Sequence, residues 1–323
     1  MQAASGHDDA SERLLHAEGT ARLRERLRRT LVVRQSLRGG WGFNADQDAL
    51  EPTCMAILTL RNQPGQHVKR ALDRIAELQR EDGSWPAIDC ASEEGAWTTA
   101  LAILSLLSVG GDRGSVQRAI EWLLGQRGRE ANWLWRWKFR MIDTSVRFDP
   151  TKYGWSWIPG TASWVIPTAF SLIALRRASH LCVTTKLDER IQFGVEMLLD
   201  RMCPGGGWNA GNGVAFGMPY APYIDTTAIA LLALRGDEHE PGIQGSLMWL
   251  MDHLLSCPSP YSLAWGILAV AAYRRHNGAH ELLYHAPASL TSLIEKNWPT
   301  DVCTLAVCAL ALDAVAGDNV FEV

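Results

Sequence analysis

The chain has 323 residues, a net charge of -4 and 47% hydrophobic residues, which is the composition of a globular protein with a large core. The slight acidic balance excludes the basic surface of a nucleic-acid-binding protein, so we expect no nucleic acid partner. No apolar run approaches the roughly 18 residues of a transmembrane helix. Fourteen tryptophans indicate a large aromatic surface, because each indole has a wide ring to bury and one N–H to satisfy.

The first ten residues are polar and carry Asp8 and Asp9. We expect residues 1–10 to form a flexible tail, without the apolar run of a signal peptide. The seven cysteines are scattered and include no Cys-x-x-Cys pair, so neither a disulfide framework nor a zinc ribbon is indicated. We therefore expect a cytoplasmic location, no metal and no other cofactor.

Two kinds of predicted helix alternate along the rest of the chain. The first kind is amphipathic, with apolar residues at helical spacing, as at Ala71, Ile75 and Leu78. Its six copies cover residues 11–36, 67–79, 115–126, 188–202, 242–256 and 281–297. Because one face of each copy is charged, these segments are predicted to lie on the outside of the molecule.

The second kind of helix repeats one phrase: a threonine, two residues, a small residue and an apolar run that ends in leucine. The clear copies begin at Thr53, Thr99, Thr168 and Thr227, and weaker copies begin at Leu263 and Cys303. Each copy is apolar nearly all round, which is typical of a helix that is buried on every side.

Six buried helices that alternate with six exposed ones predict an all-α fold, an (α/α)6 toroid. Short loops make sequence neighbours antiparallel, so the six inner helices are expected to run parallel to one another. Residues 11–323 are expected to form one such domain. Two connections are longer, a Trp-rich insertion at 127–164 and a Gly-rich insertion at 203–223. Loops of this length are usually functional or disordered, and dense aromatic residues favour function.

Glycine and tryptophan mark the junctions that lead into the buried helices. The copies are Gly39-Gly40-Trp41-Gly42-Phe43, Gln79-Arg80-Glu81-Asp82-Gly83-Ser84-Trp85 and Gly205-Gly206-Gly207-Trp208, with Gln126 and Trp133 as a degenerate fourth. These junctions resemble the Gln-Trp repeats of squalene and oxidosqualene cyclases, which protein prenyltransferase β-subunits share in weaker form. The resemblance covers nearly the whole chain and implies a toroid that encloses an apolar isoprenoid.

The segment Pro222-Tyr223-Ile224-Asp225-Thr226-Thr227-Ala228 resembles the Pro-Asp-x-Asp-Asp-Thr-Ala motif of cyclases that begin by protonating an alkene. In that alignment Asp225 takes the place of the middle aspartate, so the resemblance implies that Asp225 is the general acid. Tyr223 and Thr226 replace the two flanking acids, whose hydrogen bonds help to set the strength of the donor.

One register of the repeat gathers carboxylates, two residues before each repeat position. It holds Glu51, Trp97, Ile166, Asp225, Tyr261 and Asp301. All six fall at the N-termini of parallel helices and hence at one end of the ring. The acids either cap free N–H groups or face the cavity as acid or base. We take Asp225, Glu51 and Asp301 as the catalytic candidates.

Aromatic faces in a central cavity would stabilise carbocations through cation–π interaction. The candidate substrate-binding residues are Trp41, Phe43, Trp97, Trp155, Trp157, Trp164, Trp208, Tyr223 and Tyr261. Basic residues interleave with the Trp-rich insertion, namely Arg136, Lys138, Arg140, Arg147 and Lys152. They would either hold a diphosphate or stack over aromatic rings.

The predicted function is that of a terpene-cyclase-like enzyme that holds an apolar polyene. A prenyltransferase β-subunit-like transferase is the second hypothesis: Asp301-Val302-Cys303 resembles the Asp-x-Cys zinc ligands of those subunits, but no histidine follows His285 to complete the set. A third is a non-catalytic toroid that binds an isoprenoid, another hydrophobic ligand or a protein. A fourth is a carbohydrate-active toroid, because tryptophan platforms and paired carboxylates also suit sugars; the Gln-Trp junctions argue against it.

The partner expected in each isoprenoid hypothesis is an apolar small molecule. A single toroid leaves its cavity open to water, so the Trp-rich insertion, a partner chain or self-association would have to close it. The arginines of residues 22–34 would allow peripheral contact with an anionic membrane surface, although Leu23, Leu27 and Leu31 give that helix an ordinary core face.

Overall fold

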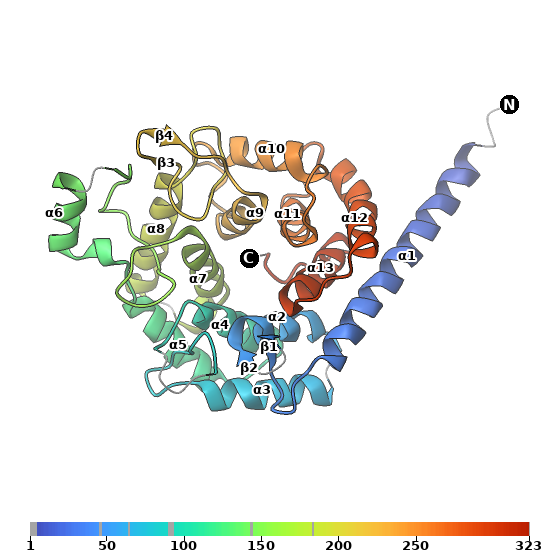
Figure 1. Cartoon of the computed structure of the whole chain (residues 1–323), viewed down its shortest axis with the longest axis horizontal. Helices are drawn as coiled ribbons and strands as arrows, with labels where there is room; N and C mark the ends of the chain where they lie inside the picture. Colours follow the sequence, from blue (N-terminus) through green and yellow to red (C-terminus); the bar gives the residue numbers. More distant parts are fainter. Residues whose placement is uncertain are drawn as a thin grey trace.

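The computed structural model describes the backbone of residues 5–44, 47–63, 65–89, 94–142, 145–182 and 184–322, with side chains from residue 18 onward except Asn44. Helices close into a ring in which an inner set is surrounded by an outer set (Figure 1). The predicted all-α toroid is confirmed.

The inner ring consists of α2 (Leu50–Leu60), α4 (Thr98–Ser108), α7 (Val165–Arg177), α9 (Ile224–Ala233), α11 (Pro260–Ala272) and α13 (Val302–Val315). The outer helices are α1 (Ser5–Val33), α3 (Gln66–Leu78), α5 (Arg113–Gly125), α8 (Thr185–Asp200), α10 (Ile243–Leu254) and α12 (Ala279–Lys296). Each inner helix contacts the next, and α13 contacts α2 to close the ring. Of the segment 1–10, where we expected a tail, residues 5–10 belong to α1 and residues 1–4 lie outside the described residues.

Shorter elements lie in the connections between the helices of the ring. They are the hairpins β1 (Trp41–Asn44) with β2 (Gln47–Ala49) and β3 (Val214–Ala215) with β4 (Met218–Pro219), the 3-10 turns η1 (Arg129–Ala131) and η2 (Ser179–Leu181), and helix α6 (Trp133–Met141). Helix α6 lies in the Trp-rich insertion and stands outside the ring, at the left of Figure 1. In the described part of the chain, no helix is long and apolar enough to cross a membrane.

Helix α13 shows why the repeated phrase forms the inner ring. Every residue from Val302 to Ala314 is buried, and the small alanine and cysteine side chains let neighbouring helices approach closely. An outer helix such as α1 buries only one stripe, in which Leu27 and Leu31 are fully buried. The two burial patterns follow the two kinds of periodicity in the sequence.

Tryptophans at four junctions tie an outer helix to the following inner helix. The indole N–H of each donates to a carbonyl near the end of the outer helix: Trp41 to Leu31 at 2.8 Å, Trp85 to Ile75 at 2.8 Å, Trp155 to Leu123 at 2.9 Å and Trp208 to Leu198 at 2.6 Å. The backbone N–H of each donates to the repeat threonine, namely Thr53, Thr99, Thr168 and Thr227. The repeated tryptophan and the repeated threonine are therefore hydrogen-bonded to each other at every one of these four junctions, and we call each such pair a joint.

The fourth joint corrects a sequence prediction. The predicted pairing of Gln126 with Trp133 is wrong, because Trp133 is 75% exposed on α6. The joint is made by Trp155 instead. The Trp-rich insertion separates the two partners, so the nearest tryptophan in sequence is not the one that folds back.

Replacing Trp85 by phenylalanine should lower the free energy of unfolding by about 1–3 kcal/mol. The ring can still pack, but the buried carbonyl of Ile75 loses its donor. The exposed Trp133→Phe variant is the matched control and should unfold like the wild type. Chemical denaturation of the three proteins tests this, and equal midpoints would show that the joint does not hold the ring.

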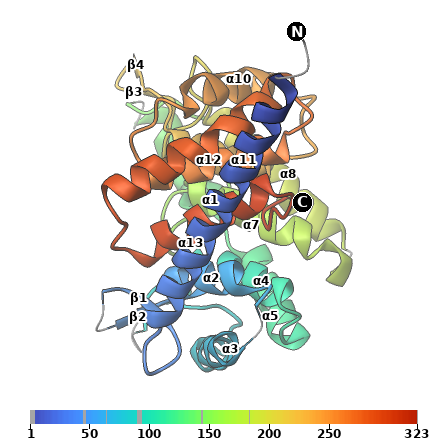
Figure 2. The ribbon, with the colours of Figure 1, turned by 90° about the vertical axis from the view of Figure 1, so that its right-hand side faces the viewer.

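The two ends of the ring differ. Both hairpins lie at the end where the inner helices begin, and the C-terminus lies at the opposite end (Figure 2). There the guanidinium of Arg177 donates to the carbonyls of Val320 and Glu322 at 3.1 and 2.9 Å. The amide of Asn319 donates to the carbonyl of Leu268 at 2.9 Å. The segment after α13 therefore closes the far end of the ring.

Candidate functional site

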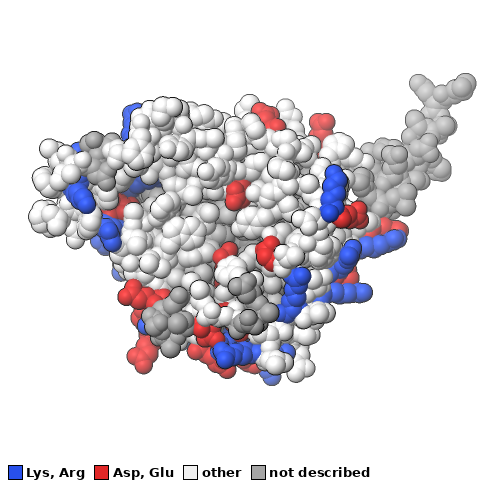
Figure 3. Space-filling model, in the orientation of Figure 1, with Lys and Arg blue, Asp and Glu red and all other residues white. Residues whose placement is uncertain are grey.

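The inner helices begin together at one end of the ring, which we call the mouth. Glu51 and Asp225 lie in the first turns of α2 and α9, Tyr261 lies in the first turn of α11, and Trp97 and Asp301 are the N-caps of α4 and α13. All five are half-buried. Acidic side chains stand near the centre of this face, and most lysines and arginines lie towards its edge (Figure 3).

The order of the inner helices fixes how the carboxylates face one another. Helices α13 and α2 are neighbours in the ring, so Asp301 stands beside Glu51. Helix α9 is three helices away from α2 in either direction, so Asp225 stands across the mouth from Glu51. The mouth therefore carries a pair of acids on one side and a single acid on the other.

The environment of Glu51 favours the protonated form of its carboxyl group. Burial and, to a lesser degree, the neighbouring carboxylate of Asp301 raise the pKa of Glu51 from 4.5 to about 7. The same crowding of negative charge, with burial as the larger cause, raises the pKa of the Tyr261 hydroxyl and of the Cys303 thiol. At neutral pH a substantial fraction of Glu51 carries a proton.

Asp301 has a structural role as the N-cap of α13. Its Oδ1 accepts the N–H of Thr304 at 2.7 Å and so caps α13. Asp225, by contrast, lines a rim pocket of about 510 Å³ together with Tyr223, Trp249 and Cys257. Helix capping therefore accounts for Asp301, whereas Asp225 borders open space.

A continuous aromatic path leads from the mouth into the ring. Trp157 and Trp97 meet edge to face with centroids 5.1 Å apart, and Trp97 lies 5.6 Å from Phe170. Phe170 lies 5.7 Å from Trp265, which in turn lies 6.4 Å from Tyr261. Such rings present negative faces that attract a cation. Among the predicted substrate-binding residues, the structure thus brings together Trp97, Trp157 and Tyr261.

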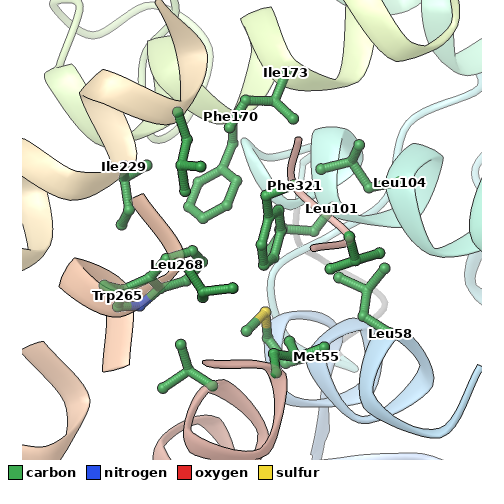
Figure 4. Packing of buried hydrophobic residues seen from close by; sticks show 14 of the residues in the cluster. Met55, Leu58, Leu101, Leu104, Phe170, Ile173, Ile229, Trp265, Leu268 and Phe321 are labelled. Carbon is green, nitrogen blue, oxygen red and sulfur yellow. The ribbon is translucent and has the colours of Figure 1, made fainter. Parts of the chain in front are cut away.

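The far end of this path is filled by Phe321, which comes from the closing C-terminal segment. Its ring lies 5.0 Å from Trp265 and 6.2 Å from Phe170 by centroid distance, and it is fully buried. Figure 4 shows these three rings turned towards one another at the centre of the ring. Phe170, Trp265 and Phe321 were missed as candidates.

A signal for two of the missed residues was present in the repeat. The residues two and five positions after each repeat start turn towards the centre, as Met55 and Leu58, Leu101 and Leu104, and Phe170 and Ile173 show in Figure 4. Trp265 holds the same register in α11. The indole N–H of Trp265 makes no hydrogen bond of ordinary geometry among the described residues, but it lies close enough to the Tyr261 hydroxyl to offset part of the rise that burial causes in the pKa of that group.

Six other predicted residues lie away from the path. Trp41, Trp155 and Trp208 are almost fully buried in the junctions. Trp164 and Tyr223, the N-caps of α7 and α9, are 37% and 55% exposed, and Phe43 on β1 is 52% exposed. The indole N–H groups of Trp41, Trp155 and Trp208 are hydrogen-bonded to carbonyls of the outer helices. These three residues therefore hold the fold together and are not part of the candidate site.

The basic residues of the insertion also lie away from the mouth. Arg136, Lys138 and Arg140 belong to α6, outside the ring, and the ammonium of Lys138 lies 4.6 Å from the centroid of Trp135. Among the described residues, no three histidine, cysteine, aspartate or glutamate side chains form a group that could hold a metal ion. The Asp301–Cys303 pair therefore finds no third ligand there.

No protein-family model matches the chain, and no curated protein sequence matches it. Solved structures do match. The type II terpene cyclase MstE from Scytonema superposes with a TM-score of 0.62 at 16% identity, covering 93% of this chain and 99% of that one. The chain has the fold of a terpene-cyclase toroid. The resemblance inferred from the Gln-Trp junctions is confirmed at the level of the fold.

The same fold is found in a second structure of MstE and in a different enzyme. MstE in complex with its substrate geranylgeranyl dihydroxybenzoate superposes with a TM-score of 0.58 at 15% identity, covering 94% of this chain and 99% of that one. The cellobiose 2-epimerase of Spirochaeta thermophila superposes with a TM-score of 0.61 at 10% identity, covering 95% and 98%. At such identities the likeness shows the fold alone.

Proposed function

We propose that the chain is a terpene-cyclase-like enzyme that takes an apolar isoprenoid into the mouth and cyclises it by protonating a terminal carbon–carbon double bond. The observation that carries the proposal is Glu51, a carboxyl group with a pKa of about 7, near Tyr261 at one end of the aromatic path. An aromatic site stabilises a carbocation, and burial keeps part of Glu51 in the protonated form that a proton donor must have.

In the proposed reaction Glu51 gives its proton to the terminal alkene, forming a C–H bond and a tertiary carbocation. The π electrons of the next double bond then attack the cation and form the ring C–C bond. The final cation loses a proton to a carboxylate, which restores charge balance and leaves an isomer of the substrate. Asp225 stands across the mouth from Glu51 and is suited to accept this proton.

The assignment differs from the one that the sequence resemblance implied, in which Asp225 is the donor. The environment favours Glu51, because burial and the neighbouring Asp301 carboxylate raise its pKa to about 7, so that it keeps a proton to give at neutral pH. Asp225 borders the open rim pocket. The two assignments predict different behaviour of the same two variants, and so they can be separated.

The substrate class follows from the charge of the mouth. The first turns of the six inner helices contain glutamate, aspartate and aromatic residues but no lysine or arginine. A diphosphate would meet only negative charge there. An uncharged polyene or a prenylated aromatic compound is therefore favoured over a prenyl diphosphate.

The purified protein should convert one of squalene, a prenylated aromatic compound, farnesyl diphosphate or geranylgeranyl diphosphate into an isomer of unchanged mass. Glu51→Gln should lower the rate at least about 100-fold, whereas Asp225→Asn should shift the product towards a water-trapped alcohol. Asp73→Asn, on the exposed face of outer helix α3, is the matched control and should leave both unchanged. Mass spectrometry of the extracts distinguishes these outcomes.

Full activity in Glu51→Gln with complete loss in Asp225→Asn would return the donor role to Asp225. Retention of an unaltered isoprenoid by the wild type would replace the enzyme by the non-catalytic binding toroid.

A further inference from the structure

Helix α6 presents the largest group of exposed apolar side chains on the described part of the chain. Trp133, Leu134, Trp137, Met141 and Ile142, in and next to it, are each between 53% and 75% exposed. Trp133, Trp137 and Met141 are spaced by four residues and so share one face. A stripe of this size on a protein surface marks an interaction site.

The opposite face of α6 is fixed to the body, so the stripe cannot simply fold inward. Trp135 lies 6.0 Å from Phe139, and Phe139 lies 5.2 Å from Phe148 by centroid distance. The guanidinium of Arg129 lies 4.6 Å from the centroid of Trp135, and that of Arg201 lies 4.2 Å from Phe148. These contacts use one side of the helix and leave the stripe facing solvent.

The β3–β4 hairpin adds a second exposed apolar projection. Phe216 and Met218 are 74% and 64% exposed. Phe216 has a φ of 52°, a left-handed conformation that turns of this kind usually reserve for glycine or asparagine. Phe216 therefore places a large aromatic side chain at a strained, exposed turn position, where the ring contributes little packing to the stability of the fold.

The hairpin and α6 belong to the same part of the surface. The N–H of Phe216 donates to the carbonyl of Ser145 at 2.5 Å, and the N–H of Arg147 donates to that of Val214 at 3.2 Å. The hairpin is therefore hydrogen-bonded to the segment that follows α6. In Figure 1 both lie on the same flank of the ring.

Charge decides which partner fits this surface. Helix α6 reads Trp-Leu-Trp-Arg-Trp-Lys-Phe-Arg-Met and contains three basic residues and no acidic one, although the whole chain is acidic. Tryptophan with lysine or arginine is the composition of helices that lie in the interface of an anionic bilayer. A second copy of the chain would bring the three cations of one α6 against those of the other.

We propose that the stripe of α6, together with the tip of the β3–β4 hairpin, docks the protein on the surface of an anionic lipid bilayer. The docking does not depend on the chemistry proposed at the mouth. If that chemistry holds, it places the mouth close to the phase in which an apolar isoprenoid is dissolved.

Flotation of the full chain with phosphatidylcholine vesicles, with and without about one-third phosphatidylglycerol, tests the proposal. The wild type should float with the anionic vesicles. Trp133→Ser with Trp137→Ser should lower the partition coefficient at least tenfold, and Lys138→Gln with Arg140→Gln should remove the preference for anionic lipid and its salt dependence.

The double substitution Met248→Ser with Leu255→Ser, which removes exposed apolar side chains at 56% and 41% exposure elsewhere on the ring, is the matched control and should float like the wild type. Failure of the wild type to float, or equal flotation of all variants, overturns the proposal. A dimer that Trp133→Ser with Trp137→Ser disperses, in a protein that does not float, would make the stripe an interface between copies. Thermal unfolding of each variant shows whether it is folded.

Discussion

Replacing Phe321 by alanine should lower the free energy of unfolding by about 3–5 kcal/mol, as for other fully buried aromatic side chains. Phe321 is held between Trp265 and Phe170 at the centre of the ring. Its removal takes a contact from both rings and leaves an apolar cavity that the surrounding helices cannot close, because each is braced by its neighbours.

Phe43→Ala is the matched control, since Phe43 is half exposed at the other end of the ring, and its effect should stay within about 0.5 kcal/mol. Urea denaturation measures both variants. The cavity should also bind a small aromatic compound such as benzene, which would raise the stability of Phe321→Ala and not that of the wild type. A loss as small as that of Phe43→Ala would show that the closing segment does not support the core.

Glu51→Gln should raise the free energy of unfolding by about 2–3 kcal/mol at pH 9 and by little at pH 4. In the folded state the pKa of Glu51 is about 7, against 4.5 for the free side chain. At pH 4 the carboxyl is mainly protonated in both states. Between pH 4.5 and 7 the folded state binds more protons, so stability falls as the pH rises, and above pH 7 the full cost of the buried charge remains. Glutamine carries no such charge.

Denaturation of wild type and Glu51→Gln at both pH values measures this difference. Asp301→Asn gives a second comparison: it keeps a side chain that can cap α13 but removes the smaller of the two causes of the raised pKa. It should therefore recover only part of the effect. Identical pH dependence in wild type and Glu51→Gln would mean that the Glu51 carboxylate is well solvated, and the proposed acid would lose its support.

The sequence predicted the ring because its construction repeats. One threonine, one tryptophan and one all-apolar phrase recur at each joint, and the hydrogen bonds of Trp85 and Trp208 show the same geometry twice. The register also placed Glu51, Asp225 and Asp301 at one end, since parallel helices share their N-terminal side.

The contents of the ring were harder to predict. A helix that is apolar all round, such as α11, has no polar face to reveal which side turns to the centre, so Trp265 could be found only from its register in the repeat. Phe321 lies outside the repeat altogether. Trp41 and Trp97 cannot be told apart from the sequence, because only their contacts differ. The indole N–H of Trp41 donates to the carbonyl of Leu31 in a junction. Trp97 packs against Trp157 at the mouth.

Closure of the ring also bears on how the chain acquires its structure during translation. The free side of α2 is covered by α13, and about 240 residues separate the end of α2 at Leu60 from the start of α13 at Val302. At a synthesis rate of roughly 5–20 residues per second, the partner of α2 emerges about 10–50 s later. Throughout that interval one side of the almost wholly apolar helix α2 stays exposed on the nascent chain. We therefore expect the nascent chain to bind chaperones that shield hydrophobic segments.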